Sequence, residues 1–392
     1  MSKRLAVLAL MMILLVCLPV WALAANLTIA DGETATLSGT LSEGCNIQVD
    51  GQATLVLDHV NMTANQYAAL KIDGTGSLNI IYKGTNTLRN PHYGIFSECD
   101  EVTLTPGSVD ALLRIDCQFD SGFDVKTLHL AEGAKVDVNS SAGSGLYASG
   151  LHVGANAVLN VTGGWHGIDL VGDATISKNA LVNAHGSYDG LWLRSSNVVV
   201  EAGAEVNLSS DGATHAAGSP LDIFRGCFLI KSGARVNAKT DVTFAAIMVD
   251  GGSLIVEEGA TLNGVSNRYN GMGLMTNETS SIQLNSENVT FSGGTKGAIC
   301  KWHMGYVGEP GTLQLGPQLI AQHRNAAEEP WEEMTGNTTL KRYFRTAKAT
   351  AMPEPEANVP KTGDESNVIL WSVLAAVSML GMMALVRKRK EA

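Results

Sequence analysis

Basic residues are scarce in this chain of 392 residues. Its 27 Lys and Arg stand against 38 Asp and Glu, which gives a formal net charge of −11. Proteins that bind nucleic acid need a basic face to neutralise phosphates, so this balance argues against nucleic acid as a partner. Charged residues amount to only 17% of the chain, whereas 45% is hydrophobic. The chain therefore has ample material for a buried core.

Cysteine is infrequent, and its spacing fits neither a disulfide framework nor a zinc site. Cys17 lies in the N-terminal apolar run, which leaves an odd number in the rest of the chain, and no two of these form a CxxC pair. We expect buried, unreactive thiols, although a Cys99–Cys117 bridge stays open. No metal ion and no cofactor is expected. The remaining cysteines are Cys45, Cys99, Cys117, Cys227 and Cys300.

Long amphipathic helix patterns are missing from about residue 27 to 320. Proline is rare as well, with 10 Pro against 42 Gly, so turns are many and rigid linkers few. The segment instead shows short alternating apolar runs separated by Gly or Asn, a pattern typical of β-strands. The sequence therefore predicts an all-β protein.

A repeat organises this segment. Six copies align on Ala134, Ala157, Ala180, Ala204, Ala234 and Ala260, at steps of 23, 23, 24, 30 and 26 residues. Two positions after each Ala stands Val or Leu, and four positions before it stands Leu, Val or Ile. Three positions after it is a polar column: Asp137, Asn160, Asn183, Asn207, Asn237 and Asn263.

A period near 25 residues is the signature of a right-handed parallel β-helix, in which each coil advances by about 4.8 Å. Residues 25–320 hold about 12 such coils, which makes a rod roughly 55 Å long. A β-sandwich is the rival architecture, but its turns would recur every 8–12 residues or so. Residues 321–346 abandon the repeat and are expected to cap the rod. A linker at 347–358 follows.

The N-terminus has the pattern of a secretory signal peptide. Lys3 and Arg4 precede an apolar run, and the small residues Ala22 and Ala24 mark the exit from it. We expect residues 1–24 to be removed; a retained membrane anchor is the alternative.

The C-terminus combines three features in order. The sequence Val359-Pro360-Lys361-Thr362-Gly363 precedes residues 368–386, which carry no charge and are long enough to cross a membrane as a helix. Four consecutive basic residues follow at 387–390, which predicts a cytoplasmic tail.

This arrangement of residues 359–392 resembles the sorting signal of sortase-anchored surface proteins of Gram-positive bacteria, with Val359 in place of the usual Leu. The resemblance implies that a sortase cleaves between Thr362 and Gly363 and joins the Thr362 carboxyl covalently to peptidoglycan. The protein would then reside in the cell wall, tethered to the membrane only before sorting. A plain membrane anchor is the alternative.

Residues 54–88 are similar to a parallel β-helix carbohydrate-binding domain of clostridial-type surface proteins. The likeness lies in an apolar triplet, a Val-Asn step, an Ala-rich strand and the turn GTNTL. It implies an extracellular domain that binds acidic or neutral polysaccharide, and it assigns no binding residue.

The polar column offers one candidate ligand surface. Asn160, Asn183 and Asn207 would point outward at about 4.8 Å spacing and could present amides to sugar hydroxyls. The alternative is an amide ladder in which each side chain bonds to its neighbour and stabilises the stack.

Aromatic residues offer a second candidate. The segments 163–170 and 186–193 align at Gly167 and Gly190, which places three pairs on neighbouring coils. Aromatic rings give sugars rigid stacking platforms, but the same rings could simply close the turn over the core. The pairs are Trp165 with Tyr188, His166 with Asp189, and Asp169 with Trp192.

Three function classes remain. The preferred one is a wall-anchored rod that binds polysaccharide or mediates adhesion. A structural or protein-adhesion rod without glycan binding is the second. A polysaccharide-degrading enzyme is the third, but Asp169, Asp189, Asp222 and Arg225 are spread one per coil, on loops as we expect, without the paired acids that such catalysis needs.

Overall fold

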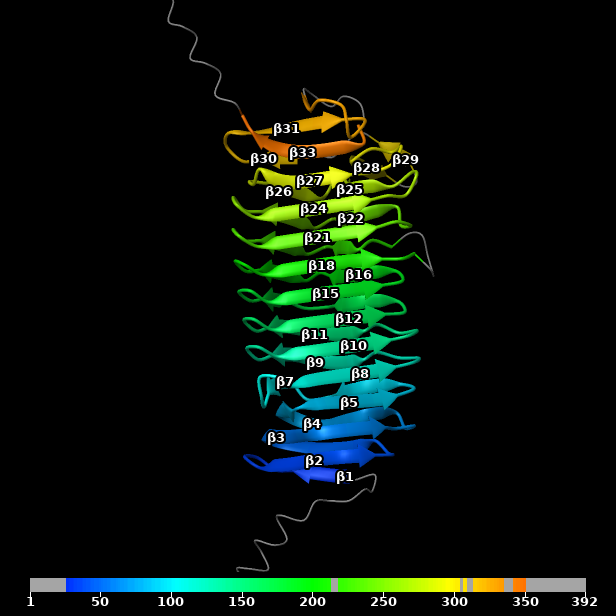
Figure 1. The fold of residues 1–392 in the computed structure, drawn as a ribbon, viewed down its shortest axis with the longest axis vertical. Helices are drawn as coiled ribbons and strands as arrows, with labels where there is room; N and C mark the ends of the chain where they lie inside the picture. Colours follow the sequence, from blue (N-terminus) through cyan, green and yellow to red (C-terminus); the bar gives the residue numbers. More distant parts are fainter. Residues whose placement is uncertain (1–25, 213–217, 304–305, 309–312, 335–340, 350–392) are drawn as a thin grey trace, which may run out of the picture. The chain divides into compact units, whose positions relative to one another are not determined.

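The chain folds as a stack of parallel β-strands. The computed structural model describes residues 26–212, 218–303, 306–308, 313–334 and 341–349, and within these every helical or extended element is a strand. Each turn pairs with the next in parallel, which makes a β-solenoid of about 10 turns, fewer than the 12 expected (Figure 1). A sandwich of antiparallel sheets is excluded.

Three faces make up each turn, and the chain visits them in a fixed order, A, B and C. Face A holds the repeated polar column. Its strands are β5 (Thr85–Asn90), β8 (Leu112–Cys117), β10 (Lys135–Ser140), β12 (Val158–Gly163), β15 (Leu181–Gly186), β18 (Glu205–Ser210), β21 (Arg235–Thr240), β24 (Thr261–Ser266) and β27 (Asn288–Ser292).

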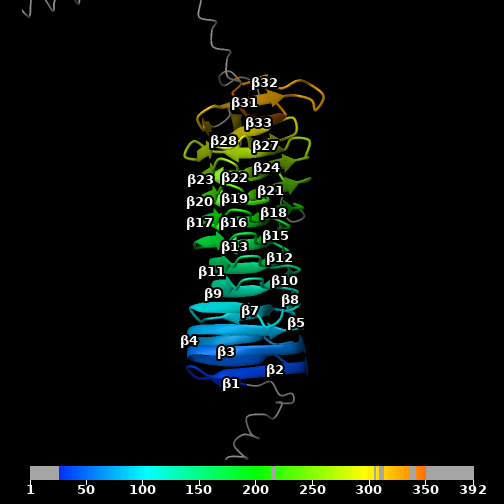
Figure 2. The ribbon, with the colours of Figure 1, turned by 60° about the vertical axis from the view of Figure 1, so that its left-hand side comes forward.

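Face B follows face A after a loop (Figure 2). Trp165 and Tyr188 end two of these loops, and His166 and Trp192 lie on face B itself. Its strands are β6 (Tyr93–Ser97), β13 (His166–Leu170), β16 (Asp189–Arg194), β19 (Leu221–Phe224), β22 (Ala245–Asp250), β25 (Met272–Thr276) and β28 (Ile299–His303).

Face C completes the turn. In two turns beyond the N-terminal ones a single strand bends from face B into face C, β9 (Phe123–Leu130) and β11 (Leu146–Val153). The separate strands of face C are β7 (Glu101–Pro106), β14 (Ala174–Ile176), β17 (Asn197–Val200), β20 (Cys227–Ile230), β23 (Ser253–Val256), β26 (Ser281–Leu284) and β30 (Leu313–Leu315).

The two ends of the stack differ. The N-terminal turns begin with the short strand β1 (Asn26–Ile29). Three strands that run over more than one face follow, β2 (Thr34–Leu41), β3 (Cys45–Thr63) and β4 (Ala68–Lys83). The C-terminal end closes with antiparallel pairs, because β33 (Tyr343–Lys348) pairs with both β27 and β31 (Leu319–Arg324). Two short strands complete it, β29 (Tyr306–Gly308) and β32 (Glu332–Glu333). Since β33 reaches Lys348, the first residues of the expected linker belong to the sheet.

The core is built from the repeated apolar columns. Val136 lies beside Leu159, Leu159 beside Val182, and the register continues unbroken to Leu262. These side chains are at most 1% exposed. Each contributes roughly 1.5–3 kcal/mol by burial, and only stacking provides the partner that covers it.

The residue just before each repeat Ala forms a further column, and the turn conformation explains which residues occur there. The position before each repeat Ala has a left-handed backbone, with φ between 56° at Asn156 and 77° at Gly203. Gly adopts this conformation without strain, and Asn tolerates it better than other residues do. The repeat therefore uses only Gly or Asn there: Gly133, Asn156, Asn179, Gly203, Gly233 and Gly259.

Several expected features lie outside the described residues. These are the signal peptide at 1–24, the linker beyond residue 349, the motif at 359–363 and the apolar span at 368–386. Among the residues that the structure does describe, no helix is long and apolar enough to span a membrane. Cys99 and Cys117 are both buried, and neither forms a disulfide bond.

Candidate functional site

A tight loop between faces A and B presents Trp165. A Cβ atom on Gly163 would lie 1.8 Å from the backbone oxygen of His166, and one on Gly164 would lie 2.1 Å from that of Ser141. Only glycine therefore allows the chain to pass this close to itself. The loop leaves Trp165 51% exposed, whereas His166, the next residue, is only 5% exposed.

The rings around His166 form a stack on face B. The imidazole lies between the indoles of Trp165 and Trp192, at centroid distances of 5.8 and 4.7 Å and interplanar angles of 30° and 26°. Tyr188 meets it edge-on at 5.6 Å. The expected neighbours are in place, because His166 pairs with Asp189 in register and Asp169 pairs with Trp192. The Tyr188 amide also donates to the Trp165 carbonyl.

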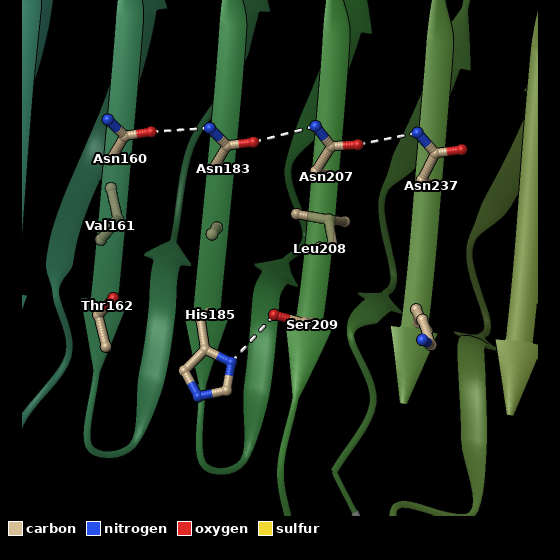
Figure 3. A pocket seen from close by; sticks show the side chains of 11 residues that line it. Asn160, Val161, Thr162, Asn183, His185, Asn207, Leu208, Ser209 and Asn237 are labelled. Carbon is tan, nitrogen blue, oxygen red and sulfur yellow. Dashed lines mark hydrogen bonds between the residues drawn. The ribbon is translucent and has the colours of Figure 1, made fainter. Parts of the chain in front are cut away.

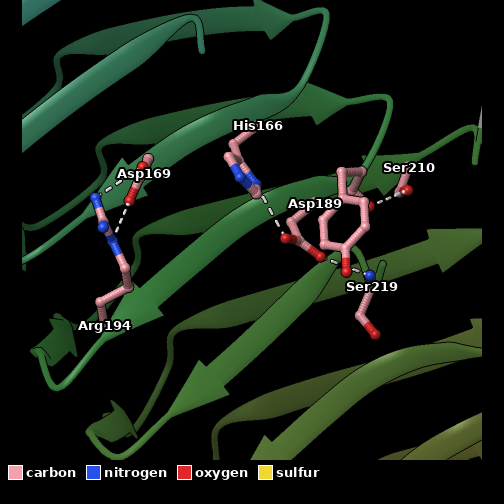
Figure 4. Close-up of polar contacts among 7 residues, drawn as sticks. His166, Asp169, Asp189, Arg194, Ser210 and Ser219 are labelled. Atoms are coloured by element: carbon pink, nitrogen blue, oxygen red, sulfur yellow. Dashed lines mark hydrogen bonds and ion pairs between the residues drawn. The ribbon is translucent and has the colours of Figure 1, made fainter. Parts of the chain in front are cut away.

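A buried carboxyl group faces the imidazole. His166 Nδ1 lies 2.9 Å from Asp189 Oδ2, without the directionality of a hydrogen bond, and Asp189 is fully buried (Figure 4). The other oxygen, Oδ1, accepts a hydrogen bond of 2.7 Å from the backbone N–H of Ser219. The strand register places His166 beside Asp189. Ser219 reaches Asp189 because it lies in the segment that leads into β19.

Burial controls the protonation of both groups. Loss of solvent lowers the pKa of His166 to about 4 and raises that of Asp189 to about 8. The Ser219 hydrogen bond lowers the pKa of Asp189, but by less than burial raises it. Near pH 7 the pair is therefore a neutral imidazole beside a neutral carboxylic acid.

Asp169 is held in a different state by an arginine. Arg194 Nε donates a hydrogen bond to Asp169 Oδ1, and Arg194 Nη2 donates one to Asp169 Oδ2, both at 2.9 Å (Figure 4). Burial raises the pKa of Asp169, and the Arg194 charge opposes this rise. The guanidinium also lies over the rings of Trp192 and Tyr147, at 4.7 and 5.4 Å. It fixes the Trp192 indole by cation–π contact.

Asp222 extends this group of acids by one turn. It lies beside Trp192 in register and is only 5% exposed. Among the described residues its Oδ1 has no hydrogen-bond partner. Burial, together with Asp189 and Asp250, raises its pKa well above the usual range. Our expectation that the acids lie on loops was wrong: Asp169, Asp189 and Asp222 belong to β13, β16 and β19.

The polar column of face A forms a continuous amide ladder. Asn183 Nδ2 donates to Asn160 Oδ1 at 2.7 Å, and Asn207 Nδ2 donates to Asn183 Oδ1 at 2.9 Å (Figure 3). All bonds run in one direction, with each donor on the later turn. The ladder comprises Asp137, Asn160, Asn183, Asn207, Asn237, Asn263 and Thr290.

The direction of this ladder predicts unequal effects of two substitutions. Asn183→Asp removes a donor from the middle and places a carboxylate against Asn160 Oδ1, so we expect the free energy of unfolding to fall by about 1 kcal/mol. Asp137→Asn changes the end that only accepts, and should cost less than about 0.5 kcal/mol. Urea denaturation at pH 7 followed by circular dichroism measures both. Equal losses would contradict the ladder as a directional element.

A shallow groove of about 460 Å³ lies over the ladder. Its floor includes Asn160, Asn183 and Asn207, and its edge includes His185, whose Nδ1 lies 2.9 Å from Ser209 Oγ (Figure 3). Each ladder amide uses one of its two N–H groups within the ladder. Asn207 donates its second to Glu205 Oε1, so of these three amides Asn160 and Asn183 could offer a second N–H to a ligand. The groove is open and has no buried anchor, so the face B site is the stronger candidate.

The sequence missed two residues of the face B site. Arg194 pairs diagonally with Asp169, two positions beyond its register partner, and Ser219 follows an insertion in the longest repeat. Within the described residues no group of His, Cys, Asp and Glu has the arrangement of a metal site. Comparisons of the chain with protein-family models, with curated proteins and with solved structures each gave no match.

Proposed function

We propose that this protein is a surface protein of a Gram-positive cell wall whose solenoid binds polysaccharide at the face B site. The half-exposed indole of Trp165, held against the buried His166–Asp189 pair, is the observation that carries this proposal. A rigid exposed ring is a suitable platform for the C–H face of a sugar. Trp192 and Arg194 supply a second ring and a fixed polar group beside it.

The anchoring part of the proposal comes from the sequence. Residues 1–24 have a signal-peptide pattern, and residues 359–392 have the order of a sorting signal. In this proposal a sortase joins Thr362 to peptidoglycan, and the membrane holds the chain only before that step. The solenoid, which ends at Lys348, is then displayed outside the cell.

Truncation of Trp165 tests the ligand site. We expect Trp165→Ala to weaken polysaccharide binding about tenfold, because one lost stacking contact is worth on the order of 1 kcal/mol. Trp331→Ala is a matched control, since that indole packs between Arg324 and Arg345 in the C-terminal strands. Affinity electrophoresis on a panel of polysaccharides measures both variants. Full binding by Trp165→Ala, or loss in both variants, would contradict the site.

Polysaccharide cleavage is a second candidate function, favoured by the buried acids. A carboxyl group that stays protonated near pH 7 can act as a general acid, and the pKa of Asp189 and of Asp222 is raised in this sense. Release of reducing or unsaturated sugar by the wild type, abolished in Asp222→Asn, would favour an enzyme. Adherence to host protein without glycan binding would instead favour a protein-adhesion rod.

A further inference from the structure

Exposed large hydrophobic side chains gather along one corner of the solenoid. Among the described residues only two of them lie elsewhere, Val109 between faces C and A and Val171 between faces B and C. The others all lie in the loops from face A to face B, on the right-hand side of Figure 1. They are Tyr67 (49% exposed), Phe119 (54%), Trp165 (51%), Val242 (44%) and Tyr269 (79%).

Two aromatic groups precede Trp165 on this corner. Tyr67 lies 5.0 Å from Tyr93 and 5.2 Å from Phe96, measured between ring centroids. On the next turn the ring of His92 lies 5.8 Å from that of Phe119. Both groups are partly open to solvent, and a contiguous exposed patch of this kind on a soluble domain marks an interaction surface.

The strand register places these groups in line with Trp165. Ala68 pairs with Tyr93, and the same face continues through Phe123 and Leu146 to Ile168. These four steps amount to roughly 19 Å at the usual strand spacing. In the turn between Phe119 and Trp165, the loop at residues 141–145 holds only Ser, Ala and Gly, so no large side chain blocks the path.

Charge along the corner selects among ligands. His92 Nδ1 lies 2.9 Å from Asp120 Oδ2, and Asp124 follows on face B beside Phe96. The one arginine at the face B site, Arg194, is already bound by both oxygens of Asp169. Between Tyr67 and Trp165 the loops from face A to face B, all of them described, carry no Lys or Arg, so an acidic polymer would meet carboxylates there without a cation to offset them. Arg268, which lies over the Phe244 ring, stands on the same corner beyond Trp165.

We propose that Tyr67, Phe119 and Trp165 form one track for a long, uncharged polysaccharide that lies along the stacking axis across successive turns. This inference rests on the proposed function and adds the ligand class, its minimum length and its direction. A sugar chain that occupies only the Trp165 site uses a fraction of the track, so longer chains bind more tightly.

Chain length and substitutions together test the track. The probes are galactomannan and xyloglucan as uncharged polymers, their oligosaccharides of up to three sugars, and polygalacturonate as the acidic polymer. We expect Tyr67→Ala and Phe119→Ala each to weaken binding of an uncharged polymer about fivefold to tenfold, and to leave its short oligosaccharide unchanged. Trp165→Ala should weaken both, and Val109→Ala, on another corner, should weaken neither.

The outcomes separate the two proposals. Polymer binding that depends on Trp165 but not on Tyr67 or Phe119 overturns the track and leaves the face B site standing. Tighter binding of polygalacturonate than of both uncharged polymers overturns the ligand class. If the wild type binds none of the polymers, the proposed function and the track both fail.

Discussion

Replacing Thr362 by Ala is expected to remove the protein from the cell-wall fraction almost completely, by tenfold or more. The expected sorting reaction breaks the bond between Thr362 and Gly363 and transfers the Thr362 acyl group to an amine of peptidoglycan. The Thr hydroxyl and its branched Cβ are what an enzyme groove would recognise next to the scissile bond. Without them the acyl transfer fails, and the uncleaved apolar segment at 368–386 keeps the chain in the membrane fraction.

Lys361 provides the matched control, because residues 359–363 resemble the motif Leu-Pro-x-Thr-Gly, in which the position of Lys361 is the variable one. Lys361→Ala should leave the wall fraction unchanged. Muramidase release followed by immunoblotting separates wall from membrane protein, and intact mass identifies whether the released chain ends at Thr362. Wall attachment that survives in Thr362→Ala would refute the sorting proposal and leave a plain membrane anchor.

The repeat made most of the fold predictable. Its Ala, Val and Ile columns recur at fixed offsets even though the step varies from 23 to 30 residues. Such columns can be satisfied only if equivalent positions stack, which is why the register from Val136 to Leu262 is the predicted one. The number of turns was less accurate, with about 10 in the structure against the 12 obtained by dividing the length by the period.

The candidate site was predictable only along the register. Aligning Gly167 with Gly190 correctly placed His166 beside Asp189, since both belong to the repeat. The Arg194–Asp169 pair was missed because it is diagonal and depends on side-chain length and direction. The burial of His166 and Asp189 was missed as well. Their positions in the sequence give no sign that neighbouring rings and the segment at Ser219 will cover them.

Asp189 is expected to make stability depend on pH in an unusual direction. A carboxyl whose folded pKa is raised, here to about 8, binds its proton more tightly in the folded state, so stability falls as pH rises from its unfolded pKa towards 8. His166, with a pKa lowered to about 4, has the opposite effect between pH 4 and its unfolded pKa near 6.5. The two effects largely cancel below pH 6.5.

Above pH 6.5 the imidazole effect fades within about one pH unit, and the carboxyl effect dominates. The free energy of unfolding of the wild type should therefore fall by on the order of 2 kcal/mol between pH 6.5 and 8, at about 1.4 kcal/mol per pH unit. The raised pKa of Asp222 acts in the same direction. A free energy of unfolding that falls from pH 6.5 to 8 is the reverse of what salt-bridged surface carboxylates produce, because their lowered pKa values make the fold more stable as pH rises.

Asp189→Asn isolates the effect. The amide oxygen can still accept from the Ser219 N–H, and the amide cannot ionise, so the variant should lose the part of the decline that comes from Asp189 and keep the part due to Asp222. Asp50→Asn, at an exposed position on β3, should retain the wild-type slope. Urea denaturation at several pH values between 6.5 and 8 measures all three proteins. Two outcomes would contradict the prediction: a wild-type free energy of unfolding that stays flat or rises with pH, or a slope that Asp189→Asn leaves unchanged. Either would mean that Asp189 is ionised in the folded protein. The pair beneath Trp165 would then be a charged His166–Asp189 pair and not a neutral one.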